Sequence, residues 1–396
     1  MLDREACIVL NMISGIGYVK YTALREEFGS PAAVCGRNAE ELQRVAGIGP
    51  ALAERIASYD WEKELAAELE LADKAGVRIL TLFDEGYPDV LRHLYDPPLC
   101  LYVRGRLPAL PENAVAVVGS RRMSAYGERM TRSITAEAVA AGYSVISGLA
   151  FGVDTVAHRT AVECGGLTVA VLGGGLMHIH PQENVPLARQ IVESGGAVCT
   201  EFPMNFPVSR TSFPRRNRIV AGMARATIVT EAGPASGALI TARLALENGR
   251  DVFAVPGNID SPNSTGTNAL IRDGAKAITG SQDILSEYEG LYPGRIQYDT
   301  ELYSPPKRAE KVSVSAKTEI DKPQTIPYSD LESRLTEYTE DHRALLRCIS
   351  RGETHVDEMA ASTGFSAAKV LACMTVLTIR GAVKPLPGKR YSLNLK

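Results

Sequence analysis

The chain has 396 residues, of which 45% are hydrophobic and 22% charged, and its formal net charge is -3. This length allows about two to three domains with sizeable cores, and the slightly negative charge excludes a generally basic nucleic-acid coat protein. Any site for a polyanion therefore has to be a local patch. Seven scattered cysteines without a CxxC pair favour reduced thiols over disulfides or a zinc site. The acidic start "MLDREACIVLNMI" is atypical of a signal peptide, and no apolar run is long enough for a membrane span. We therefore expect a cytoplasmic protein without a membrane partner.

Residues 1–80 are predicted to form a small helical domain of the helix-hairpin-helix (SAM-like) type. Two similar pieces, "MISGIGYVKYTALREEFGS" and "RVAGIGPALAERIASY", each place Gly-Ile-Gly before a helical stretch. Such a turn exposes backbone N–H groups at a helix N-terminus, where a phosphate can bind. Residues 1–110 carry 12 basic and 17 acidic side chains, so packing or support of a partner interface is at least as good an interpretation. A proline-rich connector is expected over residues 81–110.

Residues 111–288 alternate short apolar strands with helical stretches. The strands are expected at residues 114–120, 144–150, 168–174, 197–202, 226–232, 251–257 and 276–279. This alternation predicts an α/β fold, a Rossmann-like doubly wound parallel sheet with helices on both faces. Ligands of such sheets bind beyond the carboxyl ends of the strands, in the loops that lead into the helices.

The C-terminal part of the chain is predicted to contain a linker and a further domain. Residues 289–330 have mixed charge, several prolines and few large aliphatic side chains, which is typical of a flexible linker. Residues 331–396 predict three helices and a hairpin, the order of a winged-helix domain. A helix that reads the major groove needs polar and basic side chains, whereas the third helix offers only Lys369 and some threonines. This composition favours protein contact or regulation over sequence reading.

The stretch "RTSFPRRNRIVAG", from Arg210 to Gly222, concentrates positive charge. It holds four arginines in nine residues, and residues 202–230 hold five arginines and no Asp or Glu. Over residues 111–288, 14 of the 15 basic side chains are arginine, which is preferred for bidentate contact with phosphate or carboxylate. An anion should compensate this charge. Phe213 lies between Arg210 and Arg216 and offers either a stacking surface for an unpaired base or core packing.

The loops after the expected strands combine small residues with arginines. The loops "VVGSRR", "SGLAFGVD", "LGGG" and "EAGPASGALIT" place free N–H groups near helix N-termini, which describes an anion-binding trough. No loop has the GxGxxG or GxxxxGK[ST] spacing, so NAD, FAD and P-loop nucleotides are not expected. His178 and His180 lack a third ligand, so no metal or other cofactor is expected either. Several arginines on several loops favour a nucleic-acid backbone over a mononucleotide, which needs fewer contacts.

In their order and spacing, the motifs "GSR", "SGLAFGVDTVAH", "FPRRNRIVAG", "SGALITARLALENGRDVFAVPG" and "GTNALIRDGA" resemble the DNA-processing protein A (DprA/Smf) family. The resemblance is strong over residues 85–280. It implies a variant Rossmann domain that binds single-stranded DNA and forms a homodimer. It also implies that the protein protects incoming DNA and loads the RecA recombinase onto it during natural transformation and recombination, without being an enzyme. His180-Pro181 stands where family members often have Tyr-Pro with a nearby lysine.

The motif positions and the strand-end loops together give an expected DNA-binding set. Within it, the resemblance assigns Arg121, Arg210, Phe213, Arg216 and Asn217 to the family's motif positions. The full set is Gly119, Ser120, Arg121, Gly148, Arg210, Phe213, Arg215, Arg216, Asn217, Arg218, Ser236, Gly237 and Thr267. Leu270 and Ile271 are expected at a dimer or RecA surface, although both could equally belong to the core. No catalytic residue and no metal ligand is expected.

The alternative from another class is an enzyme, a nucleoside-monophosphate hydrolase similar to the lysine-decarboxylase-like Rossmann proteins. Those proteins carry a PGGxGTxxE loop, which joins phosphate-binding glycines to a catalytic glutamate. In "TEAGPASGALIT" the acid, Glu231, precedes the glycines, and no acid follows them at that spacing. A purely structural adaptor that acts through its terminal domains would leave the arginine stretch unexplained.

Overall fold

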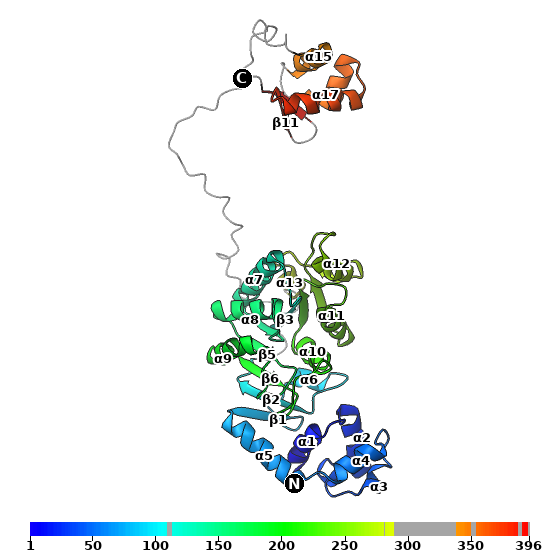
Figure 1. Cartoon of the computed structure of the whole chain (residues 1–396), viewed down its shortest axis with the longest axis vertical. Helices are drawn as coiled ribbons and strands as arrows, with labels where there is room; N and C mark the ends of the chain where they lie inside the picture. The colour runs from blue at the N-terminus through cyan, green and yellow to red at the C-terminus, as the bar shows by residue number, and fades with distance from the viewer. Residues whose placement is uncertain (109–112, 281, 289–337, 350–353, 387–389, 395–396) are drawn as a thin grey trace. The chain divides into compact units, whose positions relative to one another are not determined.

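The computed structural model describes residues 1–108, 113–280, 282–288, 338–349, 354–386 and 390–394. The chain divides into two compact units, Met1–Ser304 and Pro305–Lys396 (Figure 1). The expected linker over residues 289–330 lies outside the described residues.

The first unit begins with a helical region that has the predicted helix-hairpin-helix arrangement. Its elements are α1 (Asp3–Met12), α2 (Tyr18–Phe28), η1 (Ala32–Val34), α3 (Ala39–Leu42), α4 (Pro50–Ala57) and α5 (Trp61–Lys74). In each Gly-Ile-Gly turn the first glycine is left-handed, Gly15 at φ 99° and Gly47 at φ 81°, a conformation that a side chain would strain. The second glycines, Gly17 and Gly49, are the N-caps of α2 and α4.

A nine-stranded sheet forms the centre of the first unit. Its strands are β1 (Val77–Thr81), β2 (Cys100–Gly105), β3 (Ala114–Val118), β4 (Ser144–Ser147), β5 (Thr168–Val171), β6 (Ala197–Thr200), β7 (Ala226–Val229), β8 (Asp251–Ala254) and β9 (Lys276–Ala277). The order across the sheet is β1-β2-β6-β5-β4-β3-β7-β8-β9. Strands β3 to β9 pair in parallel and match the seven predicted strands, so the doubly wound sheet is confirmed. The direction of winding reverses at β3, which places the topological switch point beside it.

The segment expected as a connector, residues 81–110, contributes a strand to this sheet. Strand β2 pairs antiparallel with β6 on one side and with β1 on the other. The neighbouring prolines, Pro97 and Pro98, are typical of a loop, but residues 100–103 are completely buried. Their burial between β1 and β6 explains why an apolar run follows the prolines. The short helix α6 (Asp89–Arg92) precedes this strand.

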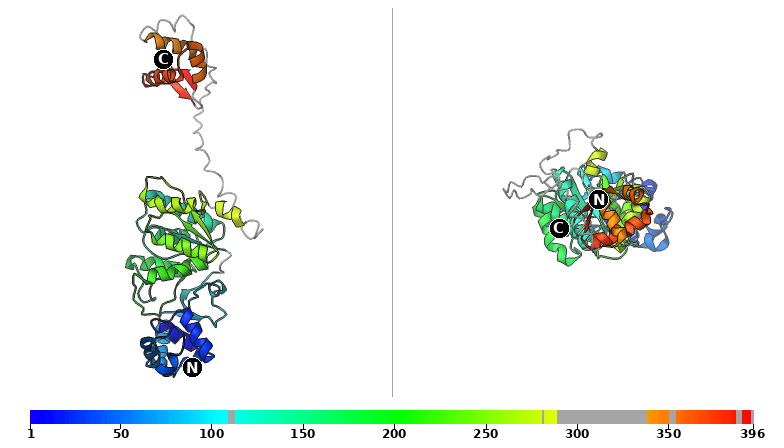
Figure 2. Two further views of the ribbon diagram at one scale, coloured as in Figure 1. Left: turned by 90° about the vertical axis from the view of Figure 1, so that its right-hand side faces the viewer. Right: turned by 90° about the horizontal axis from the view of Figure 1, so that it is seen from above.

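Helices cover both faces of the sheet, with α7, α8 and α9 on one face and α10, α11 and α12 on the other (Figure 1). Alternate residues of β3 show the division, because Val115 and Val117 pack with α7 and α8, whereas Ala116 and Val118 pack with α10 and α11. Figure 2 shows the α10–α12 side facing the viewer. The bounds are α7 (Ala125–Ala140), α8 (Val153–Glu163), η2 (Gln182–Asn184), α9 (Val185–Glu193), α10 (Ser212–Met223), α11 (Gly237–Glu247), η3 (Pro262–Ser264), α12 (Thr265–Arg272) and α13 (Gln282–Tyr288).

The second unit has the predicted winged-helix order. Its elements are α15 (Glu340–Ile349), β10 (Thr354–His355), α16 (Val356–Thr363), α17 (Ala367–Ile379), β11 (Val383–Leu386) and β12 (Arg390–Leu393). Lys369, the basic residue of α17, pairs with Asp341 at 2.8 Å and lies over the ring of Phe365. Across the described part of the chain, no single helix is long and apolar enough to cross a membrane; α16 and α17 meet that test only as a bent pair.

Candidate nucleic-acid interface

A groove of about 690 Å³ lies at the carboxyl ends of β3, β4 and β7, beside the switch point of the sheet. Its walls come from the loops after these three strands, from α10 and the first turns of α8 and α11, and from single residues in the loops after β6 and β8. Ten of the thirteen expected DNA-binding residues line it: Gly119, Ser120, Arg121, Gly148, Arg210, Phe213, Arg216, Asn217, Ser236 and Gly237. Arg215, Arg218 and Thr267 do not.

The groove is electropositive. Arg121, Arg122 and Arg210 are exposed, and within the described residues none of them has a carboxylate at ion-pair distance. A fourth arginine, Arg216, lines the same groove but is buried. Asp154 is the acidic residue among the lining side chains, so the four arginines carry an excess of positive charge.

Arg216 keeps part of its hydrogen-bonding capacity unused. It is 4% exposed, its Nη1 donates to the carbonyl of Val171, and its Nε has no hydrogen-bond partner among the described residues. Burial lowers the pKa of Arg216 to about 10, and the nearby Asp154 carboxylate opposes this shift. An unsatisfied buried donor costs about 1–3 kcal/mol, so the position of Arg216 is a local cost that the rest of the fold offsets.

The loop after β4 is shaped around Arg216. A Cβ at Gly148 would lie 1.9 Å from Arg216 Nη1, so a side chain at this position would displace the guanidinium. Asp154 Oδ2 accepts hydrogen bonds from the backbone N–H groups of Gly148 at 3.1 Å and Ala150 at 3.3 Å. Burial raises the pKa of Asp154, and the Arg216 charge opposes that rise. Sequence reasoning missed Asp154, although an acid directly after "SGLAFGV" at a helix start was visible.

Phe213 is packed between neighbours. The guanidinium carbon of Arg121 lies 4.9 Å from the centroid of its ring. A Cβ at Gly173 would lie 2.8 Å from Phe213 Cδ1, and the ring of His180 lies 6.2 Å away, centroid to centroid. Phe213 therefore supports Arg121, and the two offer the groove a combined cationic and aromatic surface.

The opposite wall of the groove is the N-terminus of α11. Ser236 is its N-cap, and the Ser236 hydroxyl accepts a hydrogen bond from Ala238 N at 3.3 Å. A Cβ at Gly237 would meet no atom within 4 Å, so this position is open for close approach. Asn217 Nδ2 donates to Gly237 O at 3.4 Å and connects α10 to this wall.

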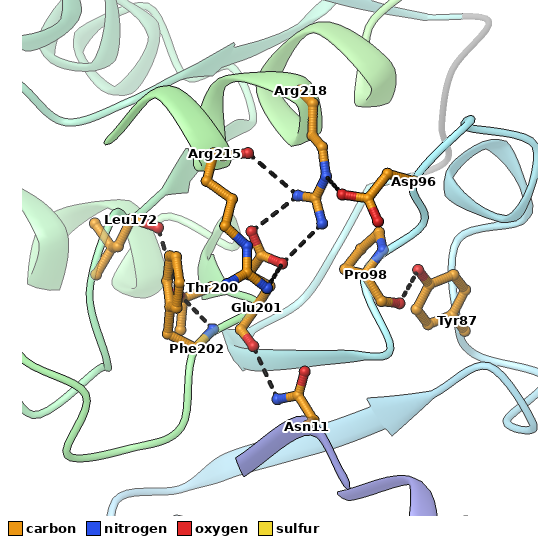
Figure 3. A network of polar contacts seen from close by, with 10 residues as sticks. All are labelled: Asn11, Tyr87, Asp96, Pro98, Leu172, Thr200, Glu201, Phe202, Arg215 and Arg218. Atoms are coloured by element: carbon orange, nitrogen blue, oxygen red, sulfur yellow. Dashed lines mark hydrogen bonds and ion pairs between the residues drawn. The ribbon is translucent and has the colours of Figure 1, made fainter. Parts of the chain in front are cut away.

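Arg215 and Arg218 lie on the other side of α10 and are compensated within the protein (Figure 3). Arg218 Nη1 and Nη2 donate to the two carboxylate oxygens of Glu201, each at 2.8 Å, and its Nε donates to Asp96 at 3.0 Å. Arg215 Nη2 donates to Glu201 at 3.2 Å. Burial alone would lower the pKa of Arg218, but the two carboxylates raise it. Asn11 of α1 donates to the backbone carbonyl of Glu201, so the same residue also contacts the helical region.

The other expected positions lie away from the groove. Thr267 is buried, and its hydroxyl donates to Ser264 O at 3.1 Å. Leu270 and Ile271 are half-buried on α12, and Leu270 packs against the core beneath α10 and α11. Arg225, the fifth arginine of residues 202–230, lies over the ring of Tyr288 at 4.2 Å.

Glu231, the acid of the hydrolase alternative, supports the fold. Ser124 donates to its carboxylate from the backbone N–H at 2.8 Å and from the hydroxyl at 2.6 Å. Since Ser124 is the N-cap of α7, the buried Glu231 carboxylate stabilises the start of that helix and does not line the groove. Within the described residues, no group of three or more His, Cys, Asp or Glu side chains could hold a metal ion.

Comparison with known proteins extends over nearly the whole chain. The family model described as DNA recombination-mediator protein A matches residues 78–289. The DprA winged helix domain matches residues 329–389, and the SAM-like helix-hairpin-helix tandem matches residues 8–58. Protein Smf of Synechocystis sp. is 33% identical over 400 residues, which cover 98% of each chain.

The chain belongs to the DNA-processing protein A (DprA/Smf) family. Protein Smf of Escherichia coli is 41% identical to it over 254 residues, which cover 64% of this chain and 68% of the relative. The X-ray structure of DprA from Streptococcus pneumoniae superposes with a TM-score of 0.61 at 33% identity, over 72% of this chain and 98% of the other. Membership of the DprA/Smf family gives this chain a DNA-processing role in recombination.

Proposed function

We propose that this DprA/Smf protein binds single-stranded DNA in the groove beside β3, protects incoming DNA and loads RecA onto it. One observation carries the DNA-binding part. Three exposed arginines without a carboxylate partner in the described chain meet the buried Arg216 in one groove. The remaining arginines of α10, Arg215 and Arg218, are compensated by Glu201. The excess charge is therefore confined to the groove, where phosphates would supply the missing acceptors.

The shape and chemistry of the groove support an unpaired strand as the ligand. A groove of about 690 Å³ accepts a few phosphates and bases of a flexible strand, whereas a rigid duplex presents a much wider cylinder. The lining combines arginines, an aromatic ring and the open backbone at Gly237, the first residue of α11. Positively charged grooves with aromatic side chains bind single strands with little sequence preference.

The groove residues divide into three proposed roles. Arg121, Arg122 and Arg210 would contact phosphates at the surface, and Arg216 would hold one at the floor. The loops that contain Gly119 and Ser120 and the N-terminus of α11 would let the backbone approach closely. Asp154 would hold the loop after β4 in position beside Arg216 without touching DNA.

The RecA, dimer and location parts of the proposal rest on the family resemblance. Leu270 and Ile271 would contribute to a dimer or RecA surface, in keeping with their half-buried positions on α12. All seven cysteines are free thiols, which supports a reducing compartment such as the cytoplasm. The protein would act by binding and not by catalysis.

A salt titration tests the groove. Binding of oligothymidine should weaken with salt at a log–log slope of about -0.7 for each phosphate contact, hence about -3 for four arginines. Arg121→Ala should reduce the magnitude of that slope by about 0.7, whereas Arg215→Ala, the matched control outside the groove, should leave it unchanged. Equal affinity for duplex and single strand, or equal slopes in the two variants, would contradict the proposal.

A second assay tests the loading step. The protein should accelerate assembly of RecA filaments on single strands covered by single-strand-binding protein, and Arg121→Ala should lose most of this effect. Normal DNA binding without any acceleration would refute RecA loading and leave the groove proposal intact.

A further inference from the structure

A second aromatic residue, Phe151, is next in sequence to a residue of the groove and has no assigned role. It is 44% exposed. Its neighbour Ala150 lines the groove, and a Cβ on its other neighbour, Gly152, would lie 2.3 Å from the carbonyl oxygen of Ser120. The backbone at Phe151 therefore lies between the groove and the turn that carries Arg121. Single exposed aromatic residues are common, so the argument depends on this position and on the loop around it.

The loop that carries Phe151 is held in one conformation. Leu149 has φ 57°, in the left-handed region that non-glycine residues rarely adopt. Asn184 Nδ2 donates to Leu149 O at 2.9 Å and to Thr155 Oγ1 at 2.8 Å, and that hydroxyl donates to Ala150 O at 2.7 Å. These bonds offset the backbone strain, and strain of this kind persists where the surroundings over-determine a loop. An exposed ring on a rigid loop loses little conformational freedom when a ligand stacks on it.

The other aromatic residue of the groove, Phe213, presents no comparable open face. One side of its ring faces the Arg121 guanidinium at 4.9 Å, and the ring also packs closely against Gly173. A base could reach Phe213 only if Arg121 moved, whereas the Phe151 ring is already exposed. Stacking of a base on Phe151 would therefore require no movement of Arg121.

We propose that Phe151 stacks on an unpaired base of the DNA strand where the strand crosses the rim of the groove. The arginines would hold the phosphates, and Phe151 would select for the presence of a base without selecting its identity, since every base has an aromatic face. This inference rests on the proposed binding of single-stranded DNA. The expected contribution of one stacked base is about 5- to 150-fold in affinity.

Paired ligands separate base stacking from phosphate binding. The full chain and its Phe151→Ala variant would be titrated with oligothymidine and with an abasic deoxyribose-phosphate oligomer of equal length. Phe151→Ala should weaken binding of oligothymidine by about 5- to 150-fold and leave binding of the abasic oligomer and the salt slope unchanged. Phe83→Ala, which removes an exposed phenylalanine outside the groove, should change neither.

A fluorescence measurement gives an independent signature. The chain has one tryptophan, Trp61, which is buried, so Phe151→Trp would introduce an exposed reporter at the rim. Its fluorescence should be quenched by oligothymidine and not by the abasic oligomer. An equal loss on both ligands in Phe151→Ala, or no loss on either, would overturn the inference while wild-type binding stands. Absence of wild-type binding to oligothymidine would remove the proposed function and this inference together.

Discussion

Replacement of Glu201 by alanine should destabilise the first unit strongly, because Glu201 is the main counter-charge of a buried arginine. The side chains of Arg218 and Glu201 are 10% and 1% exposed, and two hydrogen bonds of 2.8 Å join them. Removal of one partner from a buried ion pair costs about 3–5 kcal/mol. The contact of Glu201 with the half-exposed Arg215 adds about 0–1 kcal/mol. The total loss is therefore about 3–6 kcal/mol, and at about 2 °C per kcal/mol for a unit of this size the melting temperature should fall by about 6–12 °C.

A paired substitution separates the cost of the lost partner from the net contribution of the pair. Glu201→Leu combined with Arg218→Met removes both charges and keeps similar volumes, and such replacements of buried ion pairs are often neutral or stabilising. The double variant should therefore recover most of the stability that Glu201→Ala loses. Because Arg218 lies outside the groove, the double variant should also bind oligothymidine as the wild type does.

Circular dichroism of the full chain during heating gives the stability, and fluorescence anisotropy with labelled oligothymidine gives the affinity. A loss below about 1 kcal/mol in Glu201→Ala would show that the pair behaves as an exposed one. A folded double variant that loses as much DNA affinity as Arg121→Ala would show that Arg218 contacts DNA, and the assignment of the two sides of α10 would fail.

Three further predictions concern the groove and its supports. Gly148→Ala should weaken oligothymidine binding by about 1–3 kcal/mol in anisotropy titrations, as Arg216→Ala should, because its Cβ would displace the guanidinium. Because a bound phosphate favours charged Arg216 and burial lowers its pKa to about 10, affinity for oligodeoxyadenosine should fall as the pH rises through that value, and Arg216→Ala should lack this step. Glu231→Ala should lower the free energy of unfolding by about 1–3 kcal/mol, and with it the melting temperature, because the Ser124 contacts are lost. When the wild type is incubated with AMP, chromatography should detect no free adenine.

The parallel sheet could be predicted because its signal is local. Each strand from β3 to β9 is a short apolar run that ends near a small or polar residue, and a helical stretch follows. Strand β2 escaped prediction because its place depends on β6, whose paired residues lie nearly 100 positions away. The prolines before β2 correctly indicate a loop at that point of the chain. They carry no information about the distant strand β6, with which β2 pairs.

The groove could be predicted in part, since the carboxyl ends of parallel strands meet at one edge. Arg216 and Arg218 show the limit of this reasoning. Two residues along a helix are about 200° apart around its axis, so the two side chains point to different sides of α10. Glu201 lies one residue before the acid-free stretch of residues 202–230, and Asp96 lies 122 residues from Arg218. The apparent charge excess of the stretch was therefore partly compensated by residues outside it.

The supporting residues of the groove gave weaker signals still. Asp154 has the appearance of an ordinary acid in the first turn of a helix, and Asn184 has the appearance of a turn residue. Their roles depend on contacts between the loop after β4 and its neighbours, which no local pattern contains.

The pairing of Glu201 with Arg218 has a consequence for how related chains can diverge. A change at one of these positions alone leaves a buried charge without its counter-charge, whereas a simultaneous change at both leaves none. Substitutions at the two positions should therefore coincide among DprA/Smf sequences, while Asp96, which is partly exposed, should vary more freely. Arg121 has no acidic partner in the described chain and should show no such covariation. Arginines of two motifs of one family would then follow different evolutionary constraints.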